Sequence, residues 1–277
     1  MKTYIIIFLA VFLLIGCREE VVFDLPVEDP QLVIEAELTD TEGPHTVRLS
    51  LTQDYFSDAP PPPVTEALVI ISDNKGHADT LEQIEPGLYV TDSLEGVIGR
   101  SYTLHIEWNG NVYEDTGTLL EEAVIDSLNY RYFEANPIFE EGYYIFFFGR
   151  LPADRNNYFR FKVYENDSLY NDRTDFLLQN NSEPPVPDTL ANIRFSYPFG
   201  NSDTVRIEMY TLEKEMYQYY LELVTLLFND GGLFSPPPQN PVSTITNLTD
   251  PDNPPLGYFQ VASVTTGTII IREEEEE

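Results

Sequence analysis

Short apolar runs separated by turn residues recur through most of this chain, and no other feature constrains its fold as strongly. In Thr46–Leu51 every second side chain is apolar, which predicts a strand with one buried face. Ser101–Trp108 and Val112–Glu114 flank Asn109-Gly110-Asn111, and Asn-Gly between two alternating runs is typical of the turn of a β-hairpin. Runs of strand length with turns about every 8–12 residues predict a mainly β fold.

The strand pattern divides the chain into two parts. We expect residues 28–120 to form an immunoglobulin-like β-sandwich, because about seven short strands follow one another there. Glu121-Glu122 marks the expected boundary. Residues 121–272 are expected to form a second β-rich domain, in which the continuously apolar segment Tyr143–Phe148 is a central strand.

One helix is expected in the second domain, over residues 212–228. Its apolar side chains recur at helical spacing, and Asn229-Asp230-Gly231 ends the pattern. The expected core-facing residues are Leu212, Met216, Tyr219, Leu223 and Leu227. Two final strands are expected after the helix, at Gly257–Val264 and Gly267–Ile271, followed by a solvated acidic tail over residues 273–277.

The first 17 residues have the layout of a bacterial lipoprotein signal. Lys2 is followed by the apolar run Tyr4–Ile15, and Gly16 stands directly before Cys17. The run is too short to cross a hydrocarbon core, which needs about 20 residues. We therefore expect residues 1–16 to be a signal peptide and Cys17 to carry a diacylglycerol and palmitate-type acyl chains, with residues 17–27 as a tether. A plain secretory signal or a short membrane anchor is the alternative.

The charge of the chain restricts its partners. It has 15 Lys+Arg against 47 Asp+Glu, a formal net charge of −32. Nucleic-acid binding depends on Lys and Arg that neutralise phosphates, so this composition argues against it. We interpret the acidity mainly as a solubility feature, with cation capture as the second interpretation. Cys17 is the single cysteine, so once it is acylated the chain has no thiol for a disulfide or a metal site.

No pattern in the sequence predicts catalysis. The chain has no nucleophile elbow, phosphate-cradling loop or dinucleotide fingerprint. His45, His77 and His105 lie in separate segments without the spacing of a zinc protease, and His105 is expected to face solvent. The Asp- and Asn-rich loops at 166–175 and 250–253 lack the spacing of a twelve-residue calcium loop, and we interpret them as solvated. We predict no enzyme activity, no cofactor and no metal site.

Three aromatic residues are expected in loops rather than in strands. Tyr55 and Phe56 precede the polyproline stretch, and Phe234 precedes Ser235-Pro236. Because aromatic residues are enriched at the centres of interfaces, these three are candidate partner contacts. The alternative is that they fold back as minor core.

The order of several short motifs resembles one known family. The motifs are Leu32–Ala36, Val47–Ser50 followed by Asp54-Tyr55-Phe56, Gly99–Leu104, and Asn240-Pro241 ahead of Leu256–Phe259. Together with the lipidated cysteine they resemble the Bacteroidota cell-envelope lipoproteins grouped as domain of unknown function 4249. The resemblance implies an outer-membrane lipoprotein whose relatives are encoded beside TonB-dependent receptors. The family offers no catalytic residues to carry over.

These observations lead to one expected function and one alternative. We expect a non-catalytic outer-membrane lipoprotein, held in the membrane through acylated Cys17, that serves as an accessory subunit to a TonB-dependent transporter in nutrient uptake. The alternative is a free-standing surface protein that binds a glycan or a peptide. The sequence leaves open the ligand and whether the protein faces the cell surface or the periplasm.

Overall fold

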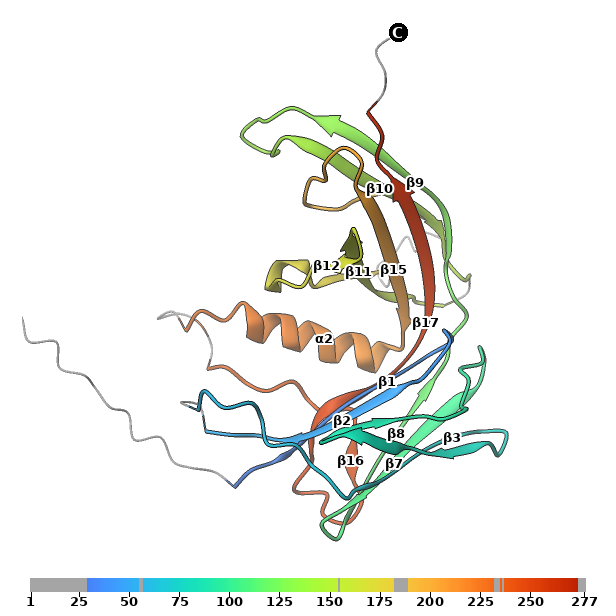
Figure 1. Cartoon of the computed structure of the whole chain (residues 1–277), viewed down its shortest axis with the longest axis vertical. Coiled ribbons are helices and arrows are strands. Elements are labelled where there is room, and N and C mark those ends of the chain that lie inside the picture. The colour runs from blue at the N-terminus through green and yellow to red at the C-terminus, as the bar shows by residue number, and fades with distance from the viewer. Residues whose placement is uncertain are drawn as a thin grey trace, which may run out of the picture.

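The structure is a computed structural model that describes residues 29–54, 57–153, 155–181, 189–231, 235 and 237–273. The expected signal peptide and tether, Cys17 included, lie outside these residues. The described chain is a curved, mainly β molecule with one α-helix on its concave side (Figure 1). The predicted mainly β fold, with a sandwich followed by a second β-rich part that carries a helix, is confirmed.

Among the described residues, nine strands form one long sheet. Eight of them follow one another in hydrogen-bonded order, and β13 pairs with β11. In that order the strands are β12 (Ser168–Leu169), β11 (Tyr158–Glu165), β15 (Thr204–Leu212), β17 (Leu256–Ile270), β1 (Leu32–Thr39), β2 (Thr46–Leu51), β6 (Leu88–Val90) and β5 (Glu82–Glu85), with β13 at Leu177–Asn180.

Two smaller sheets pack on one face of the long sheet. In the described chain, one has five strands, in the order β16 (Thr246–Asn247), β8 (Asn111–Thr118), β7 (Ser101–Trp108), β3 (Leu68–Asp73) and β4 (Ala78–Thr80). The other has three strands, in the order β14 (Thr189–Arg194), β10 (Gly142–Arg150) and β9 (Val124–Phe133). The molecule therefore contains two sandwiches that share one sheet.

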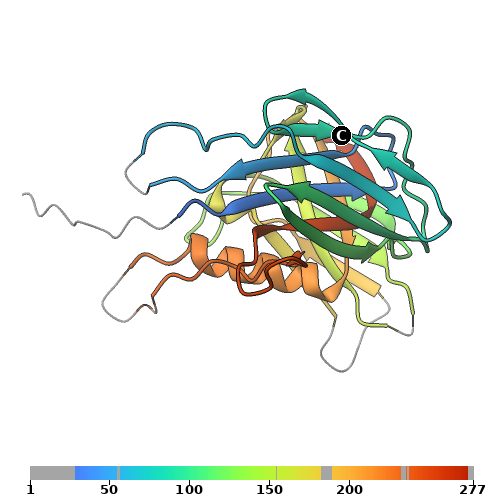
Figure 2. The same cartoon turned by 90° about the horizontal axis from the view of Figure 1, so that it is seen from below.

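The first sandwich packs β1, β2 and β6 against β3, β7 and β8, and Figure 2 shows its two layers from below. Val47 and Leu49 are fully buried, as the alternation of Thr46–Leu51 predicted. The predicted hairpin is present, because Trp108 pairs with Asn111. Asn109 and Gly110 have φ of 49° and 78°, the left-handed values that the two-residue turn requires.

The second sandwich packs the three-stranded sheet against β11, β15 and the end of β17. The alternation of β11 places Phe159, Phe161 and Val163 in this core. β10 is buried on both faces and lies between β14 and β9, so its predicted central position is confirmed.

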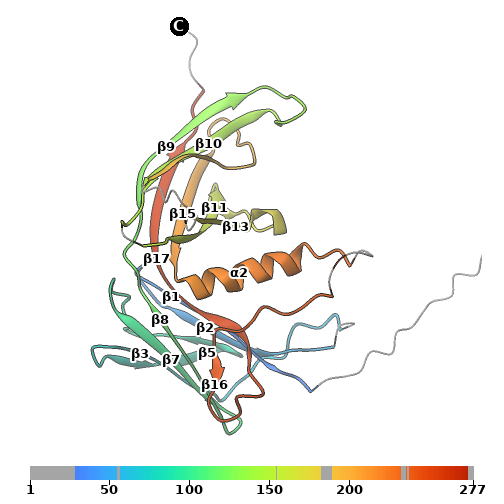
Figure 3. The ribbon, with the colours of Figure 1, turned by 180° about the vertical axis from the view of Figure 1, so that it is seen from behind.

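The helix α2 (Lys214–Leu227) covers the opposite face of the long sheet, on its concave side (Figure 3). It begins two residues later than predicted, because Leu212 is the last residue of β15 and Glu213 is the N-cap. The buried side chains of the helix are Met216, Tyr217 and Tyr220. The predicted set of core-facing residues is thus wrong in part, since Leu227 is 40% exposed. A short 3-10 helix, η1, spans Arg173–Asp175.

The end of the chain differs from the expected pair of strands. β17 is one strand of 15 residues. Residues 256–262 pair in parallel with β1, and residues 263–270 pair antiparallel with β15. Gly267 does not form a turn, since it pairs with Ile207 within the extended strand. A Cβ there would lie 3.0 Å from the Leu128 side chain, so the glycine permits close packing of β9.

The first sandwich also takes up residues from the range assigned to the second domain. Ile245, Phe259 and Val261 belong to the core of the first sandwich, although the sequence analysis assigned residues 121–272 to the second domain. Phe259 and Val261 do so because β17 is one continuous strand that contributes to both cores, and Ile245 does so because it directly precedes β16, which pairs with β8.

Candidate functional site

The four site residues predicted from sequence lie outside the described part of the chain. They are the lipidation site Cys17 and the candidate contacts Tyr55, Phe56 and Phe234. Their roles therefore stay predictions. The structure instead draws attention to a groove that the sequence analysis did not identify.

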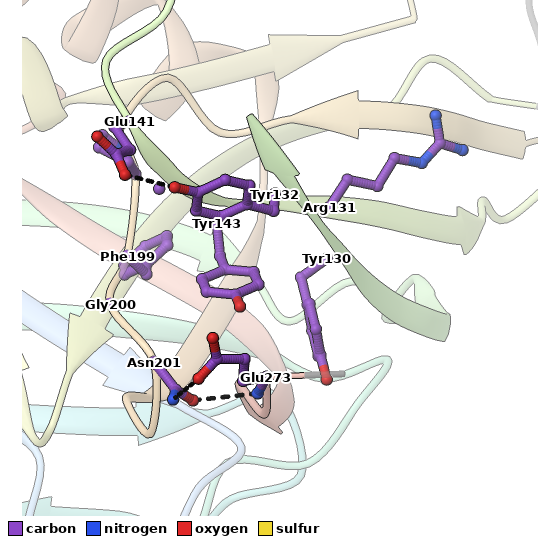
Figure 4. Close-up of a pocket in the computed structure, with 11 residues that line it drawn as sticks. Tyr130, Arg131, Tyr132, Glu141, Tyr143, Phe199, Gly200, Asn201 and Glu273 are labelled. Atoms are coloured by element: carbon purple, nitrogen blue, oxygen red, sulfur yellow. Dashed lines mark hydrogen bonds between the residues drawn. The ribbon is translucent and has the colours of Figure 1, made fainter. Parts of the chain in front are cut away.

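This groove has a volume of about 1090 Å³ and lies at the end of the second sandwich (Figure 4). It is formed by the β9–β10 hairpin, by the loop at 198–201, and by the residues that follow β17. We call it the tyrosine groove, after Tyr130, Tyr132 and Tyr143 in its wall.

The strand register brings the three tyrosines together. Tyr130 and Tyr132 are two residues apart in β9 and so share one face of the sheet. Tyr143 of β10 lies directly opposite Tyr132. Its ring meets that of Tyr130 with centroids 5.7 Å apart, and that of Tyr132 with centroids 5.2 Å apart, both edge to face. Tyr130 and Tyr143 also pack against the second core, whereas Tyr132 is 48% exposed.

The far wall of the groove is fixed to the hairpin by backbone contacts. The Tyr143 N–H donates to the Phe199 carbonyl at 2.9 Å, and the Phe199 N–H donates to the Tyr143 carbonyl at 2.8 Å. Gly142 permits this approach, because a Cβ there would lie 2.6 Å from that of Pro198. The tyrosines are therefore held by a rigid scaffold.

Polar groups line the rim of the groove. The Tyr132 hydroxyl donates to Glu141 Oε1 at 2.5 Å, and this contact raises the pKa of Tyr132 to about 12. Asn201 Nδ2 donates to Glu273 Oε2 at 3.1 Å, and the Glu273 N–H donates to Asn201 Oδ1 at the same distance. The Tyr130 hydroxyl donates to the Arg272 carbonyl at 3.0 Å.

The charged groups that face the groove are acidic. Arg131 is the basic residue among its described lining residues, but its guanidinium lies 5.0 Å from the centre of the Phe146 ring on the other face of the hairpin. Figure 4 shows the Arg131 side chain extending away from the three tyrosines, while Glu141 and Glu273 lie beside them.

The groove presents mainly aromatic, carboxylate and amide side chains. Its described lining residues include no Ser, Cys, His or Lys. Aromatic faces with a few carboxylate and amide groups provide stacking and hydrogen bonding. The alternation Tyr130-Arg131-Tyr132 in a predicted strand was a signal for this surface. The pairing with Tyr143, however, is set by the register of two strands.

A second, smaller cleft of about 510 Å³ lies where the first sandwich meets α2. Four carboxylates line it, those of Asp115, Glu213, Glu215 and Glu222. Burial raises the pKa of Asp115 to about 6, and the nearby Glu213 adds to this rise. Burial also raises the pKa of Glu213, whose Oε2 accepts the Thr118 N–H at 3.0 Å. This bond ties the start of α2 to β8.

We expect Asp115→Asn to stabilise the protein at neutral pH. The pKa of Asp115 is about 6 in the folded protein, whereas an unperturbed aspartate, as in the unfolded chain, has a pKa of 3.8. The folded state then binds more protons between these values, so the free energy of unfolding falls as pH rises through this window. Asparagine mimics the protonated carboxyl group. Because Asp115 is partly exposed, we expect the free energy of unfolding to rise by about 1–2 kcal/mol at pH 8.

Urea unfolding at pH 8 and pH 3.5 measures this effect. Most of the gain disappears at pH 3.5, where Asp115 is protonated in the folded state and largely protonated in the unfolded state. Asp58→Asn, an equal charge change in an exposed loop, is the control and leaves stability within about 0.5 kcal/mol. An Asp115→Asn variant no more stable than the parent at pH 8 contradicts the prediction.

The histidines and acidic loops serve local structure. His105 is not fully solvent-facing as predicted, since its side chain is 27% exposed and its Nδ1 lies 2.7 Å from Glu114 Oε1. In the loop at 166–175, the Asp172 N–H donates to Asp175 Oδ2 at 2.8 Å. No group of three or more Asp, Glu, His or Cys within the described ranges is arranged to hold a metal ion.

Comparisons with known proteins give a family but no activity. None of the helices in the described chain has both the length and the apolar character needed to cross a bilayer. No curated protein matches this chain. Among solved structures, the Yersinia pseudotuberculosis adhesin InvE aligns with 65% of this chain and 55% of its own, at 14% identity and a TM-score of 0.19. The chain thus spans about half of that adhesin, and a TM-score this low carries no argument about fold or function.

The family model for "Domain of unknown function (DUF4249)" matches residues 18–268, almost all of the sequence that follows Cys17. The match includes all residues of the first core, and all of the second core except Ile269 and Ile271. The chain therefore belongs to the family of domain of unknown function DUF4249.

Proposed function

We propose that this protein is a lipid-anchored, non-catalytic binding protein of the outer membrane and an accessory subunit to a TonB-dependent transporter in nutrient uptake. The observation that carries the binding role is the tyrosine groove, with three aromatic rings and a polar rim on a rigid hairpin. Rings of this kind dominate the energetics of protein interfaces.

The position of the groove supports a role at the end of the molecule remote from the anchor. The first described strand, β1, lies in the lower half of Figure 1, and the β9–β10 hairpin lies at the upper end. Cys17 precedes Asp29 by 12 residues, which span at most about 40 Å when fully extended. A protein acylated at Cys17 would therefore present the groove away from the attachment point while staying near the membrane.

The alternative proposal is a free-standing surface protein that binds a glycan or a peptide. The partial exposure of Tyr132, in a groove that also contains Glu141 and Asn201, favours it, because an aromatic face with carboxylate and amide groups also suits a sugar ring. The two proposals share the same groove and differ in what occupies it.

Affinity purification of the full lipidated chain from detergent-solubilised membranes tests these proposals. A transporter that co-purifies with the parent protein, and less with Tyr132→Ala, supports the accessory role. Retention of a glycan or peptide without a transporter supports the alternative. Phe228→Ala is the matched control, since Phe228 is 47% exposed at the end of α2, far from the groove. If the parent retains neither, both proposals fail.

We expect Cys17→Ser to release the protein from the membrane. Serine has no thiol to receive the diacylglycerol, and a polypeptide with net charge −32 has no attraction to anionic lipid. The measurement is membrane fractionation together with metabolic labelling by radioactive palmitate. Continued membrane association of the unlabelled variant would show that the anchor lies elsewhere.

A further inference from the structure

We propose that the tyrosine groove binds lysine or arginine side chains on an exposed segment of a partner protein. This inference rests on the proposed binding function and names the chemistry of its ligand. It is carried by the charge of the groove, by the arrangement of the rings and by the size of the site.

The charge of the groove favours a cation. Glu141 and Glu273 lie beside the three tyrosines, and the guanidinium of Arg131 is turned to the other face of the hairpin. The whole chain carries a net charge of −32, so its field attracts cations and repels anions over a distance. A neutral sugar is not attracted by this field, whereas a basic side chain is attracted by the field and can also pair with the carboxylates of Glu141 and Glu273.

The rings provide the second half of a cation site. The face of an aromatic ring carries negative charge density and attracts ammonium and guanidinium groups. Tyr143 meets Tyr130 and Tyr132 at interplanar angles of 85° and 61°, so the three rings do not stack on one another. Tyr132 is 48% exposed and donates its hydroxyl to Glu141, which places a carboxylate at the edge of an accessible ring.

The opposite face of the same hairpin already uses this chemistry within the chain. There Arg131 lies 5.0 Å from the centre of the Phe146 ring, and Arg194 lies 4.4 Å from that of Phe139. Both faces of the hairpin thus present aromatic rings. On the outer face arginines of the chain itself cover them, and on the groove face we infer that a partner supplies the cation.

The size of the groove indicates a segment of polypeptide rather than a small amine. A volume of about 1090 Å³ is at the upper end of the usual range for small-molecule pockets, about 300–1,000 Å³, and leaves room for several residues of a polypeptide. The groove also lies on the β9–β10 hairpin, at the end of the molecule away from β1, which argues against a lipid headgroup of the anchoring membrane. A basic segment of a partner protein fits both observations.

The probe for this inference is the peptide Gly-Lys-Gly-Lys-Gly with a fluorescent label, compared with the same peptide acetylated at both lysines. Fluorescence anisotropy with the full chain is expected to show binding about tenfold tighter for the unmodified peptide. Tyr132→Ala is expected to weaken that binding about fivefold to tenfold, and Glu141→Gln combined with Glu273→Gln by a similar factor.

The controls separate the groove from the general acidity of the chain. Phe228→Ala removes an aromatic side chain of equal exposure, and Glu82→Gln with Glu85→Gln removes two exposed carboxylates from β5. Both controls are expected to change binding less than about twofold. Equal binding of the acetylated peptide overturns the inference. So does equal weakening by the control variants, or a neutral hexasaccharide that binds the groove more tightly than the lysine peptide.

The outcome is separable from that of the proposed function. If the purified lipoprotein retains a partner through Tyr132 but the lysine peptide does not bind, the binding function stands and the cationic ligand is refuted. If the lysine peptide binds the groove but nothing co-purifies from membranes, the inference about chemistry stands and the accessory role is refuted.

Discussion

Replacing Gly257 by alanine is expected to unfold the protein or to destabilise it by more than about 4 kcal/mol. Gly257 has a φ of 105°, and a Cβ there would lie 1.9 Å from the Ile34 carbonyl oxygen. The carbonyl belongs to β1, which pairs in register with this part of β17. Neither backbone can move without breaking the parallel pairing that joins the two ends of the chain.

Thermal denaturation followed by far-ultraviolet circular dichroism measures this effect. We expect the melting temperature to fall by about 10 °C or more, since each kcal/mol shifts a domain of this size by about 2–4 °C. Gly76→Ala is the control, because Gly76 also has a positive φ, 93°, but a Cβ there would meet nothing within 4 Å. Equal melting temperatures for the two variants would show that the contact with Ile34 is unimportant.

The same experiment tests whether the two sandwiches unfold together. β17 contributes Phe259 and Val261 to the first core and Ile269 to the second, and Ile271, the second residue after Ile269, is buried in the second core as well. A strand shared in this way couples the stability of both cores. We therefore expect the protein to unfold in a single transition, and Gly257→Ala to move that whole transition to lower temperature. Coupled sandwiches also hold the tyrosine groove at a fixed place relative to Asp29.

Local patterns were sufficient to predict much of the fold. The turn at Asn109-Gly110 was predictable because its left-handed backbone depends on two adjacent residues. The buried faces of β2 and β11 were predictable because a strand alternates with a period of two. The central place of β10 followed from apolar side chains on both of its faces.

Pairings between distant segments could not be predicted in the same way. The parallel pairing of Val33 with Leu256 joins residues more than 200 positions apart, and nothing near either residue encodes it. Gly267 in β17 suggested a break between two strands. Only the position of Leu128 in another sheet shows that the glycine is needed for close packing.

The tyrosine groove escaped prediction for the same reason. Tyr130 and Tyr143 come from two strands, and Phe199 comes from a loop that reaches them through two backbone hydrogen bonds. Each tyrosine taken alone is an ordinary strand residue. The site exists because the second core ends at this point and leaves the last ring, Tyr132, partly exposed.

The second large effect is expected from Phe147→Ala, which we predict to destabilise the protein by about 4 kcal/mol. Phe147 is fully buried in the second core and meets the Phe161 ring edge to face, with centroids 5.5 Å apart. A Cβ on Gly149 would lie 3.0 Å from the Phe147 ring, which shows how closely the backbone packs there. Truncation leaves a cavity that such a tightly packed core cannot fill by relaxation.

Phe148→Ala is the matched control for this prediction, because Phe148 is the next residue of β10, points to the other face and is only partly buried. Urea unfolding of both variants measures the difference, and we expect Phe148→Ala to destabilise the protein by about 1–2 kcal/mol. Tyr130 and Tyr143 pack against the core that contains Phe147, so Phe147→Ala should also weaken peptide binding in the groove. Equal destabilisation by the two truncations would contradict the prediction, because it would show that the two faces of β10 contribute equally to stability.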